Sequence, residues 1–321
     1  MPRVPFLVPV LALVLTTFGA ASATAATLEV TADVVVVASD GQCSLREAIH
    51  NANADSQVDN ADCPAGSGAD TIVLASGGQY VISDADVDND HNGLPVVTTE
   101  IVVEGNGATI ERNSNFSCIL DDNRTAAEFR LLEVGELGDL TLGDLTLRGG
   151  CADGSGPSND GGAIRVHSGN LTLTRVLVEQ NSALDKSGGL DTSGGLSSIS
   201  IVDSTFRANH GGGGAGAIGH GGGTMTIDGS TISGNTSGGQ GGGGIGNSDD
   251  TTSGGLAWAE ARFLQNYLSC YEAVGDPYWL DKFVDHFDRM LATQQDRNGD
   301  GFLAWDTTRY RVGIVEVAEA Q

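Results

Sequence analysis

Basic and aromatic residues are both scarce in this chain of 321 residues. There are 16 Lys and Arg against 42 Asp and Glu, which gives a formal net charge of -26 at pH 7. So acidic a surface is repelled by phosphate backbones and by anionic lipids, which excludes nucleic acid and anionic membranes as partners. Aromatic residues make up only 5% of the chain. A core built from this sequence must therefore be filled mainly by Leu, Ile and Val.

The sequence also has no apolar run that favours a membrane span. The apolar stretch from Phe6 to Phe18 is shorter than the roughly 20 residues that a transmembrane helix needs. It follows Arg3 and is followed by the small-residue motifs Ala21-Ser-Ala23 and Ala23-Thr-Ala25, which are typical of signal-peptide cleavage. Residues 1–25 are therefore predicted to be a signal peptide, with a retained anchor as the alternative. The mature chain is expected to be secreted or at the bacterial cell surface.

No helical run separates the strand-like segments between residues 140 and 246, where one short pattern occurs four times. The copies start at Leu140, Leu171, Ile199 and Met225, so the starts are 31, 28 and 26 residues apart. Each copy opens with apolar residues at alternate positions, which is typical of a strand with one buried face. A period of this length is too short for a βαβ unit and predicts stacked parallel coils. A second ladder, through Ile164, Leu190, Ile218 and Ile245, has the same period.

We therefore predict an all-β fold, a right-handed parallel β-helix, over residues 26–250. Ile201 and Ile227 are expected in its buried apolar column. Asn181, Asn209 and Asn235 fall at coil corners, where Asn tolerates left-handed backbone angles and stacked side chains can hydrogen-bond between coils. Half of the residues from Gly211 to Gly246 are glycine. Because they bracket a strand-like copy, they indicate tight corners, with a disordered linker as the alternative.

A short amphipathic helix is predicted at residues 43–53, before the repeats. Leu45, Ala48 and Ile49 lie on one face of that helix. Ser44 followed by Glu47 forms a capping box. Because the terminal coils of solenoids are open, we expect this helix to cover the first coil.

A family resemblance lies in the amino-terminal part of the chain. It is carried by the stretch Cys43-Ser-Leu-Arg-Glu-Ala-Ile49, which is followed by Gly68-Ala-Asp-Thr-Ile-Val-Leu74 and then by glycine-rich coils. It resembles the secreted bacterial parallel β-helix proteins with the CSLREA motif. The Gly-Ala-Ile rungs, such as Gly162 to Ile164, are similar to those of chlamydial-type polymorphic outer-membrane proteins and other surface adhesins. The resemblance covers about residues 27–250 and implies architecture and location rather than chemistry.

Five cysteines are present, and export to an oxidising compartment allows disulfides. The preferred pairs are Cys43–Cys63 and Cys118–Cys151, which leave Cys270 alone. Other connectivities stay open at this stage, because sequence does not fix pairing.

The sequence pattern changes at residue 251 from glycine-rich, strand-like repeats to helical spacing of apolar residues. Residues 251–321 are predicted to be a helical segment with an α-hairpin, whose second helix carries Leu280, Phe283 and Val284 at helical spacing. The stretch from Leu256 to Asp281 resembles one hairpin of the α/α-toroid domains of polysaccharide epimerases, lyases and glycosidases. This segment is either a fragment of such a toroid or a cap on the last coil.

The candidate catalytic residues lie in the repeats, because parallel β-helices include pectate lyases and polygalacturonases. Asp203, Arg207, Asp228 and His220 are the candidates, and Arg175 lies in a neighbouring coil. Stacking could bring carboxylates and a base together, as glycan cleavage requires. A structural ion pair is the alternative. His167, His210 and His220 could in principle join a metal site, but they are expected to be solvent-exposed loop histidines, because their spacing fits no compact metal motif.

Calcium is the one cofactor that the sequence suggests. Asp296, Asn298 and Asp300 match the first half of an EF-hand loop, but Thr307 stands where the bidentate Glu belongs. A plain turn is the alternative. The acidic run from Asp84 to Asp90 is expected to be a solvated turn, because it lacks the remaining ligands of a calcium site.

Two functions follow from these observations. The first is a non-catalytic, adhesin-like protein outside the cell that binds an extracellular polysaccharide or another surface. The second is a polysaccharide lyase, hydrolase or epimerase. Asp, Arg and His clustered in one groove would favour the enzyme, whereas a smooth surface of Thr, Ser and Asn would favour binding.

Overall fold

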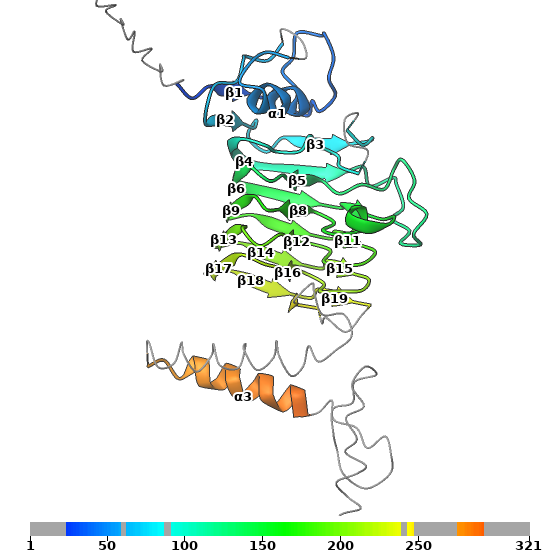
Figure 1. The fold of residues 1–321 in the computed structure, drawn as a ribbon, viewed down its shortest axis with the longest axis vertical. Coiled ribbons are helices and arrows are strands. Elements are labelled where there is room, and N and C mark those ends of the chain that lie inside the picture. Colours follow the sequence, from blue (N-terminus) through cyan, green and yellow to red (C-terminus); the bar gives the residue numbers. More distant parts are fainter. Residues whose placement is uncertain (1–23, 59–61, 87–90, 239–242, 247–274, 292–321) are drawn as a thin grey trace, which may run out of the picture.

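A computed structural model describes residues 24–58, 62–86, 91–238, 243–246 and 275–291. The chain winds into stacked coils, and every pairing between its named strands is parallel (Figure 1). The predicted all-β parallel β-helix is confirmed.

Three parallel sheets run along the stack. The first sheet has 11 strands: β1 (Thr27–Glu29), β2 (Asp70–Val73), β3 (Gln79–Ile82), β4 (Glu100–Arg112), β6 (Asp139–Arg148), β9 (Asn170–Thr174), β10 (Leu177–Glu179), β13 (Ser198–Val202), β14 (Thr205–Arg207), β17 (Thr224–Asp228) and β18 (Thr231–Ser233). The second sheet has four strands: β7 (Cys151–Ala152), β11 (Ser182–Ala183), β15 (His210–Gly211) and β19 (Thr236–Ser237). The third sheet has five strands: β5 (Leu132–Val134), β8 (Ile164–His167), β12 (Leu190–Ser193), β16 (Ile218–His220) and β20 (Ile245–Gly246).

The repeat predicted from the sequence sets the register of the coils. Leu140 pairs with Leu171, which pairs with Ile199, which pairs with Met225. Because alternate residues of a strand face opposite ways, these residues form an inward column. Two residues further along the same strands, Leu173, Ile201 and Ile227 form a second inward column, in which Ile201 is only 1% exposed. Ile227 was expected to be buried, but 36% of it is exposed. It lies on β17, which pairs with β13 alone among the described strands, so one side of Ile227 has no described strand stacked on it.

A ladder of asparagines stabilises one corner of the coils, as predicted. The Asn181 side-chain amide donates to Asn209 Oδ1 at 3.0 Å, and the Asn209 amide donates to Asn235 Oδ1 at 2.9 Å. The same Oδ1 atoms accept backbone N–H groups, as from Asn181 N at 3.1 Å. Each Asn therefore satisfies polar groups of two coils inside the protein, where an unpaired group would be costly.

The helix α1 (Leu45–Asn53) lies across the amino-terminal end of the stack, beyond β2 (Figure 1). Both halves of the predicted capping box are present between Ser44 and Glu47. Arg46 is buried, and its guanidinium donates to Gly93 O at 3.0 Å and to Asp84 Oδ1 at 3.0 Å. The buried face of α1 includes Leu45, Ala48 and Ile49, so the helix covers the first coil as expected.

The two preferred cysteine pairs are both present as disulfides. Cys43 is bonded to Cys63 beside α1, and Cys118 is bonded to Cys151 on β7. The second bond ties the segment after β4 to the second sheet. Cys270 lies outside the described residues.

Two further short helices complete the described fold. The 3-10 helix η1 (Gly156–Asn159) lies between β7 and β8, and α3 (Tyr278–Leu291) confirms the second helix of the predicted hairpin. Asp276 Oδ1 accepts the backbone N–H of Tyr278 at 3.0 Å at the start of α3. The first helix of that hairpin and the calcium candidates Asp296, Asn298 and Asp300 lie outside the described residues. Within the described ranges, no helix has the length and apolar character to span a membrane.

Candidate functional site

The outward side of the first sheet carries columns of hydroxyl groups, here called the hydroxyl face. One column consists of Thr141, Thr172, Ser200 and Thr226, and a second contains Thr109, Thr146, Thr205 and Thr231, with Leu177 in the middle. All of these side chains are partly or fully exposed. Because neighbouring strands lie about 4.8 Å apart, the hydroxyls repeat at that interval along the stack.

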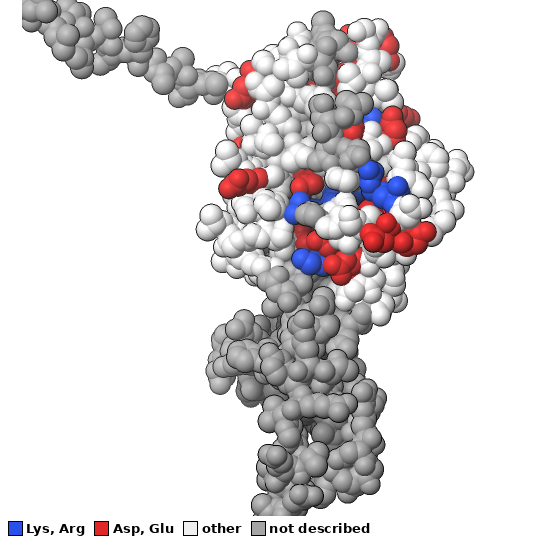
Figure 2. All heavy atoms as spheres, turned by 45° about the vertical axis from the view of Figure 1, so that its right-hand side comes forward, with Lys and Arg blue, Asp and Glu red and all other residues white. Residues whose placement is uncertain are grey.

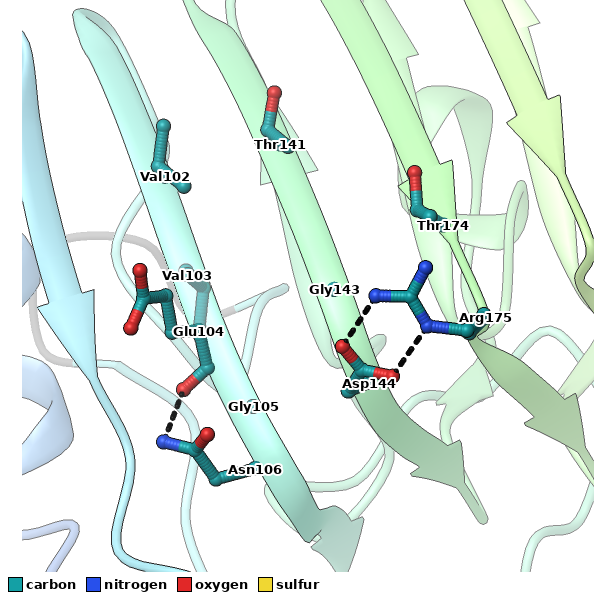
Figure 3. Close-up of a pocket in the computed structure, with 10 residues that line it drawn as sticks. All are labelled: Val102, Val103, Glu104, Gly105, Asn106, Thr141, Gly143, Asp144, Thr174 and Arg175. Carbon is teal, nitrogen blue, oxygen red and sulfur yellow. Dashed lines mark hydrogen bonds and ion pairs between the residues drawn. The ribbon is translucent and has the colours of Figure 1, made fainter.

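A groove of ≈ 330 Å³ opens in the hydroxyl face where the first sheet bends (Figure 3). Ten residues of β4, β6, β9 and the adjoining corners line it: Val102, Val103, Glu104, Gly105, Asn106, Thr141, Gly143, Asp144, Thr174 and Arg175. Gly143 is paired with Glu104 on one side and with Thr174 on the other. Glu104, Gly143 and Thr174 thus form one outward column across three strands. Since Gly143 has no side chain, there is a gap in the middle of this column, and the gap forms the floor of the groove.

An exposed ion pair stands at one end of the groove. Arg175 donates two hydrogen bonds to the Asp144 carboxylate, from Nε to Oδ1 at 2.6 Å and from Nη2 to Oδ2 at 2.6 Å (Figure 3). Their side chains are 57% and 49% exposed. These hydrogen bonds lower the pKa of Asp144 and raise that of Arg175. The planar pair therefore presents donors and an acceptor to solvent in a fixed orientation.

The opposite rim of the groove comes from the bend in β4. Asn106 has a positive φ of 51°, and its side-chain amide donates to Leu74 O at 3.0 Å. Figure 3 shows the Glu104 side chain standing on the neighbouring strand from Asp144, across Gly143. Glu104 is exposed. Its carboxylate forms no side-chain hydrogen bond or ion pair with the residues drawn in Figure 3.

Two of the predicted catalytic candidates lie in the coils that follow Arg175 along the stack. Asp203 follows Val202 at the same corner that Arg175 occupies one coil earlier, with φ values of 48° and 54°. Asp203 contributes to the raised pKa of Arg175, after Asp144. Asp228 lies in the next coil, and its backbone carbonyl accepts the Asp203 N–H at 2.9 Å. Arg175, Asp203 and Asp228 therefore lie in adjacent coils, as expected, but the carboxylate that binds Arg175 is Asp144.

Arg207 belongs to a separate ladder of charges on the other half of the first sheet. Its Nε donates to Glu179 Oε2 at 2.8 Å, and Glu179 Oε1 lies 3.8 Å from Arg148 Nη1. Arg148 in turn donates to Glu111 at 2.8 Å. The charges alternate from coil to coil, so each neutralises its neighbours.

The three histidines of the repeats, His167, His210 and His220, were expected in loops but lie on strands of two different sheets. His220 lies on β16, with Nδ1 3.1 Å from Thr192 Oγ1, whereas His167 lies on β8, with Nδ1 3.1 Å from Arg165 Nη2. His210 contacts Thr236 on the second sheet, with Nδ1 2.9 Å from Oγ1. In the described part of the chain, no three His, Cys, Asp or Glu side chains are grouped so that they could hold a metal ion.

Charged side chains of both signs also gather on one face of the stack (Figure 2). On the third sheet, Glu133, Arg165 and Asp191 form one outward column that continues to Gly219. Arg165 donates to Glu133 Oε1 at 2.7 Å instead of to Asp191. Asp191 is fully buried, and neither of its carboxyl oxygens has a hydrogen-bond partner in the described part of the chain. The nearby hydroxyl of Ser187 is equally buried and unpartnered there.

Burial raises the pKa of the carboxyl groups at this part of the third sheet. Burial, and to a smaller extent the nearby Asp160, raises the pKa of Asp191 to about 8, against the opposing effects of Lys186, Arg165 and Arg130. Burial also raises the pKa of Asp160 itself. Asp191 is therefore largely protonated at neutral pH.

Sequence reasoning missed both polar regions. The alternation of the repeats was sufficient to place Asp144 at a corner and Asp191 on an outward position, since Asp191 directly follows the inward Leu190. Nothing in the sequence indicated that the outward Asp191 would be buried, or that Gly143 would open a groove.

No family model matches the chain, and neither a curated protein nor a solved structure matches it.

Proposed function

We propose that this protein is a non-catalytic, adhesin-like binder of an extracellular polysaccharide, and that the hydroxyl face with its groove is the binding surface. The observation that carries the proposal is the groove itself. It joins an exposed Arg175–Asp144 pair, the Glu104 carboxylate and the hydroxyls of Thr141 and Thr174 in one concave site.

Sugar hydroxyls both donate and accept hydrogen bonds, so they need a mixed surface. The groove offers carboxylate acceptors, guanidinium donors and threonine hydroxyls that serve as either. Hydrogen bonds to charged groups are stronger than those between neutral groups. Val102 adds an apolar wall for the C–H face of a sugar ring.

The hydroxyl columns extend this chemistry beyond one sugar. One column runs through four stacked coils, and the other runs through five, with Leu177 in place of a hydroxyl in the middle coil. A long polymer with repeated hydroxyls can follow such a regular surface. Many weak contacts along one polymer then add up to useful affinity.

The proposed location is outside the cell. The two disulfides are compatible with an oxidising compartment. The predicted signal peptide at residues 1–25 and the resemblance at Cys43 to Ile49 support export.

Binding to a panel of polysaccharides by affinity electrophoresis or calorimetry tests this proposal. We expect the wild type to bind, and Arg175→Ala to lose affinity by about tenfold or more. Arg207→Ala removes a comparably exposed Arg of the hydroxyl face that lies outside the groove, and as the matched control it should lose less affinity than Arg175→Ala. Wild-type affinity in Arg175→Ala, or equal losses in both variants, would refute the groove as the site.

Glycan cleavage is the second candidate function, because of the third-sheet carboxyls. Asp191 and the nearby Asp160 are two carboxyl groups whose pKa is raised by burial, and glycosidases act through a pair of carboxyl groups. Asp203, Arg207, Asp228 and His220 stay candidates for this activity. Asp191 is fully buried, so a glycan reaches it only if the covering segments open, and binding is therefore better supported. Reducing ends released by the wild type, but not by Asp191→Asn, would favour cleavage over binding alone.

A further inference from the structure

We infer that the groove at Gly143 accepts an uncharged sugar residue and discriminates against uronic-acid and sulfated glycans. This inference rests on the proposed function, because it names the class of polysaccharide that the same groove would bind. It is carried by the shape of the groove floor and by the charges around it.

The floor of the groove is open because of one residue. A Cβ added at Gly143 would have Val103 O, 3.9 Å away, as its nearest atom outside the adjoining residues. The backbone of Gly143 is not in the left-handed region, so larger residues are compatible with its conformation. Glycine at this position thus provides space rather than backbone freedom, and that space lies between Glu104 and Thr174.

The charges around that space are acidic on balance. Glu104 and Asp144 are the two carboxylates of the groove lining, and Arg175 is its one base. Both of the short hydrogen bonds that Arg175 makes go to Asp144, so its charge is already balanced. The Glu104 carboxylate is then left as the net charge of the site.

An anionic sugar would meet this carboxylate without a free cation to compensate for it. Like charges brought together on a partly desolvated surface oppose binding, and the formal charge of -26 on the whole chain adds long-range repulsion. An uncharged sugar instead donates its hydroxyl protons to Glu104 and accepts from Arg175 or from the hydroxyls of Thr141 and Thr174. The electrostatics of the groove therefore favour neutral glycans.

The test compares neutral and anionic probes on the intact protein. The neutral probes are cello-, manno-, xylo- and galacto-oligosaccharides and oligomers of N-acetylglucosamine, and the anionic probes are oligogalacturonate, alginate oligomers and heparin fragments. We expect binding to at least one neutral probe, with a Kd that changes less than about twofold between about 50 mM and about 500 mM salt. Anionic probes are expected to bind at least about tenfold more weakly.

Two variants make the test specific to the groove. Gly143→Val fills the floor and is expected to weaken neutral binding by at least about tenfold, whereas Gly195→Val adds the same side chain at an open position outside the groove and is expected to bind normally. Both variants should melt within a few degrees of the wild type. Glu104→Lys reverses the net charge of the site and is expected to gain affinity for oligogalacturonate.

The outcomes separate the inference from the function beneath it. Binding confined to anionic probes, or steeply weakened by salt, overturns the inference but leaves polysaccharide binding standing. Neutral binding that persists in a folded Gly143→Val variant overturns the placement in this groove. Binding to none of the probes by the wild type overturns the proposed function and the inference together.

Discussion

At the scale of single residues, the least expected feature is a buried carboxyl group that has no hydrogen-bond partner among the described residues. Asp191 stacks between Arg165 and Gly219, and Arg165 turns instead toward Glu133. A glycine neighbour cannot supply a hydrogen bond from a side chain, so burial dominates and the group keeps its proton. Most of the cost of burying a charge is avoided because the group is largely protonated at neutral pH.

This protonation predicts how stability depends on pH. The pKa of Asp191 is about 8 in the folded chain and about 3.9 when unfolded. Between these values the folded state binds the proton that the unfolded state has released. The contribution of Asp191 to stability is therefore fully present below about pH 4 and is lost as pH rises through about 8.

Asp191→Asn should remove this dependence, because the amide has the same shape and does not titrate. We expect the variant to gain stability relative to the wild type between pH 5 and pH 8.5 in urea unfolding, by a few kcal/mol at most. Asp203→Asn, at an exposed corner, serves as the control. A difference between Asp191→Asn and the wild type that is constant over this pH range would contradict the protonated state.

At the scale of elements, the asparagine ladder holds one corner of consecutive coils. Asn209 is its central member: its Oδ1 accepts two hydrogen bonds from Asn181, and its amide donates to Val178 O at 2.9 Å and to Asn235. Replacing it removes these bonds and leaves buried donors of Asn181 unsatisfied.

We expect Asn209→Ala to lower the free energy of unfolding by about 3 kcal/mol, since unsatisfied buried groups cost more than a hydrogen bond contributes. Asn235→Ala also removes an acceptor, that of the Asn209 backbone N–H and side-chain amide, but this end of the ladder is only partly buried, so water can replace the lost oxygen and the cost should be about 1 kcal/mol. Chemical denaturation measures both. Equal losses at the two positions would show that the ladder does not act as a buried network.

The inward apolar column, like the asparagine ladder, is fully buried in its inner coils and more exposed in its last described coil. Ile201 is 1% exposed, whereas Ile227 is 36% exposed. A buried unpaired carboxylate costs several kcal/mol, so Ile201→Asp is expected to unfold the protein. Ile227→Asp should remain folded with a lower melting temperature. Circular dichroism distinguishes the two variants. The same degree of unfolding in both would contradict the difference in burial between Ile201 and Ile227.

Much of this level of structure could be predicted from the sequence. The alternation in residues 140–232 gave the strands and their register, the terminal Asn of three copies marked the corners, and Ser44 with Glu47 marked the cap. These features are local, so spacing along the chain is sufficient. The burial of Ile227 was predicted wrongly, because a period identifies the inward face but not whether another coil stacks upon it.

The groove and the Asp191 column could not be predicted for a related reason. Both depend on which residues become neighbours across coils: Gly143 opens a groove only because Glu104 and Thr174 flank it in register. Asp144 was not among the candidate residues, although it binds Arg175 more closely than Asp203 does. Outward positions also differ in burial, since Asp191 is fully buried whereas Glu104 is exposed.

At the scale of the whole molecule, the solenoid separates its polar surfaces. The hydroxyl face with its groove lies on the first sheet, and the column of Glu133, Arg165 and the buried Asp191 lies on the third. The excess of acid over base, 42 residues against 16, keeps polyanions away from the entire chain. A regular polar face on a rigid, repetitive scaffold is suited to a long uncharged polymer.

The most direct test of this account is amide hydrogen exchange with and without a bound neutral oligosaccharide. We predict that added protection is concentrated at residues 102–106, 141–144 and 174–175, which line the groove. Protection should be weaker along the rest of the hydroxyl face, and it should be unchanged on the third sheet at β8 (Ile164–His167) and β12 (Leu190–Ser193). Protection centred on Asp160 and Asp191 instead, with none at Gly143 and Asp144, would contradict the account.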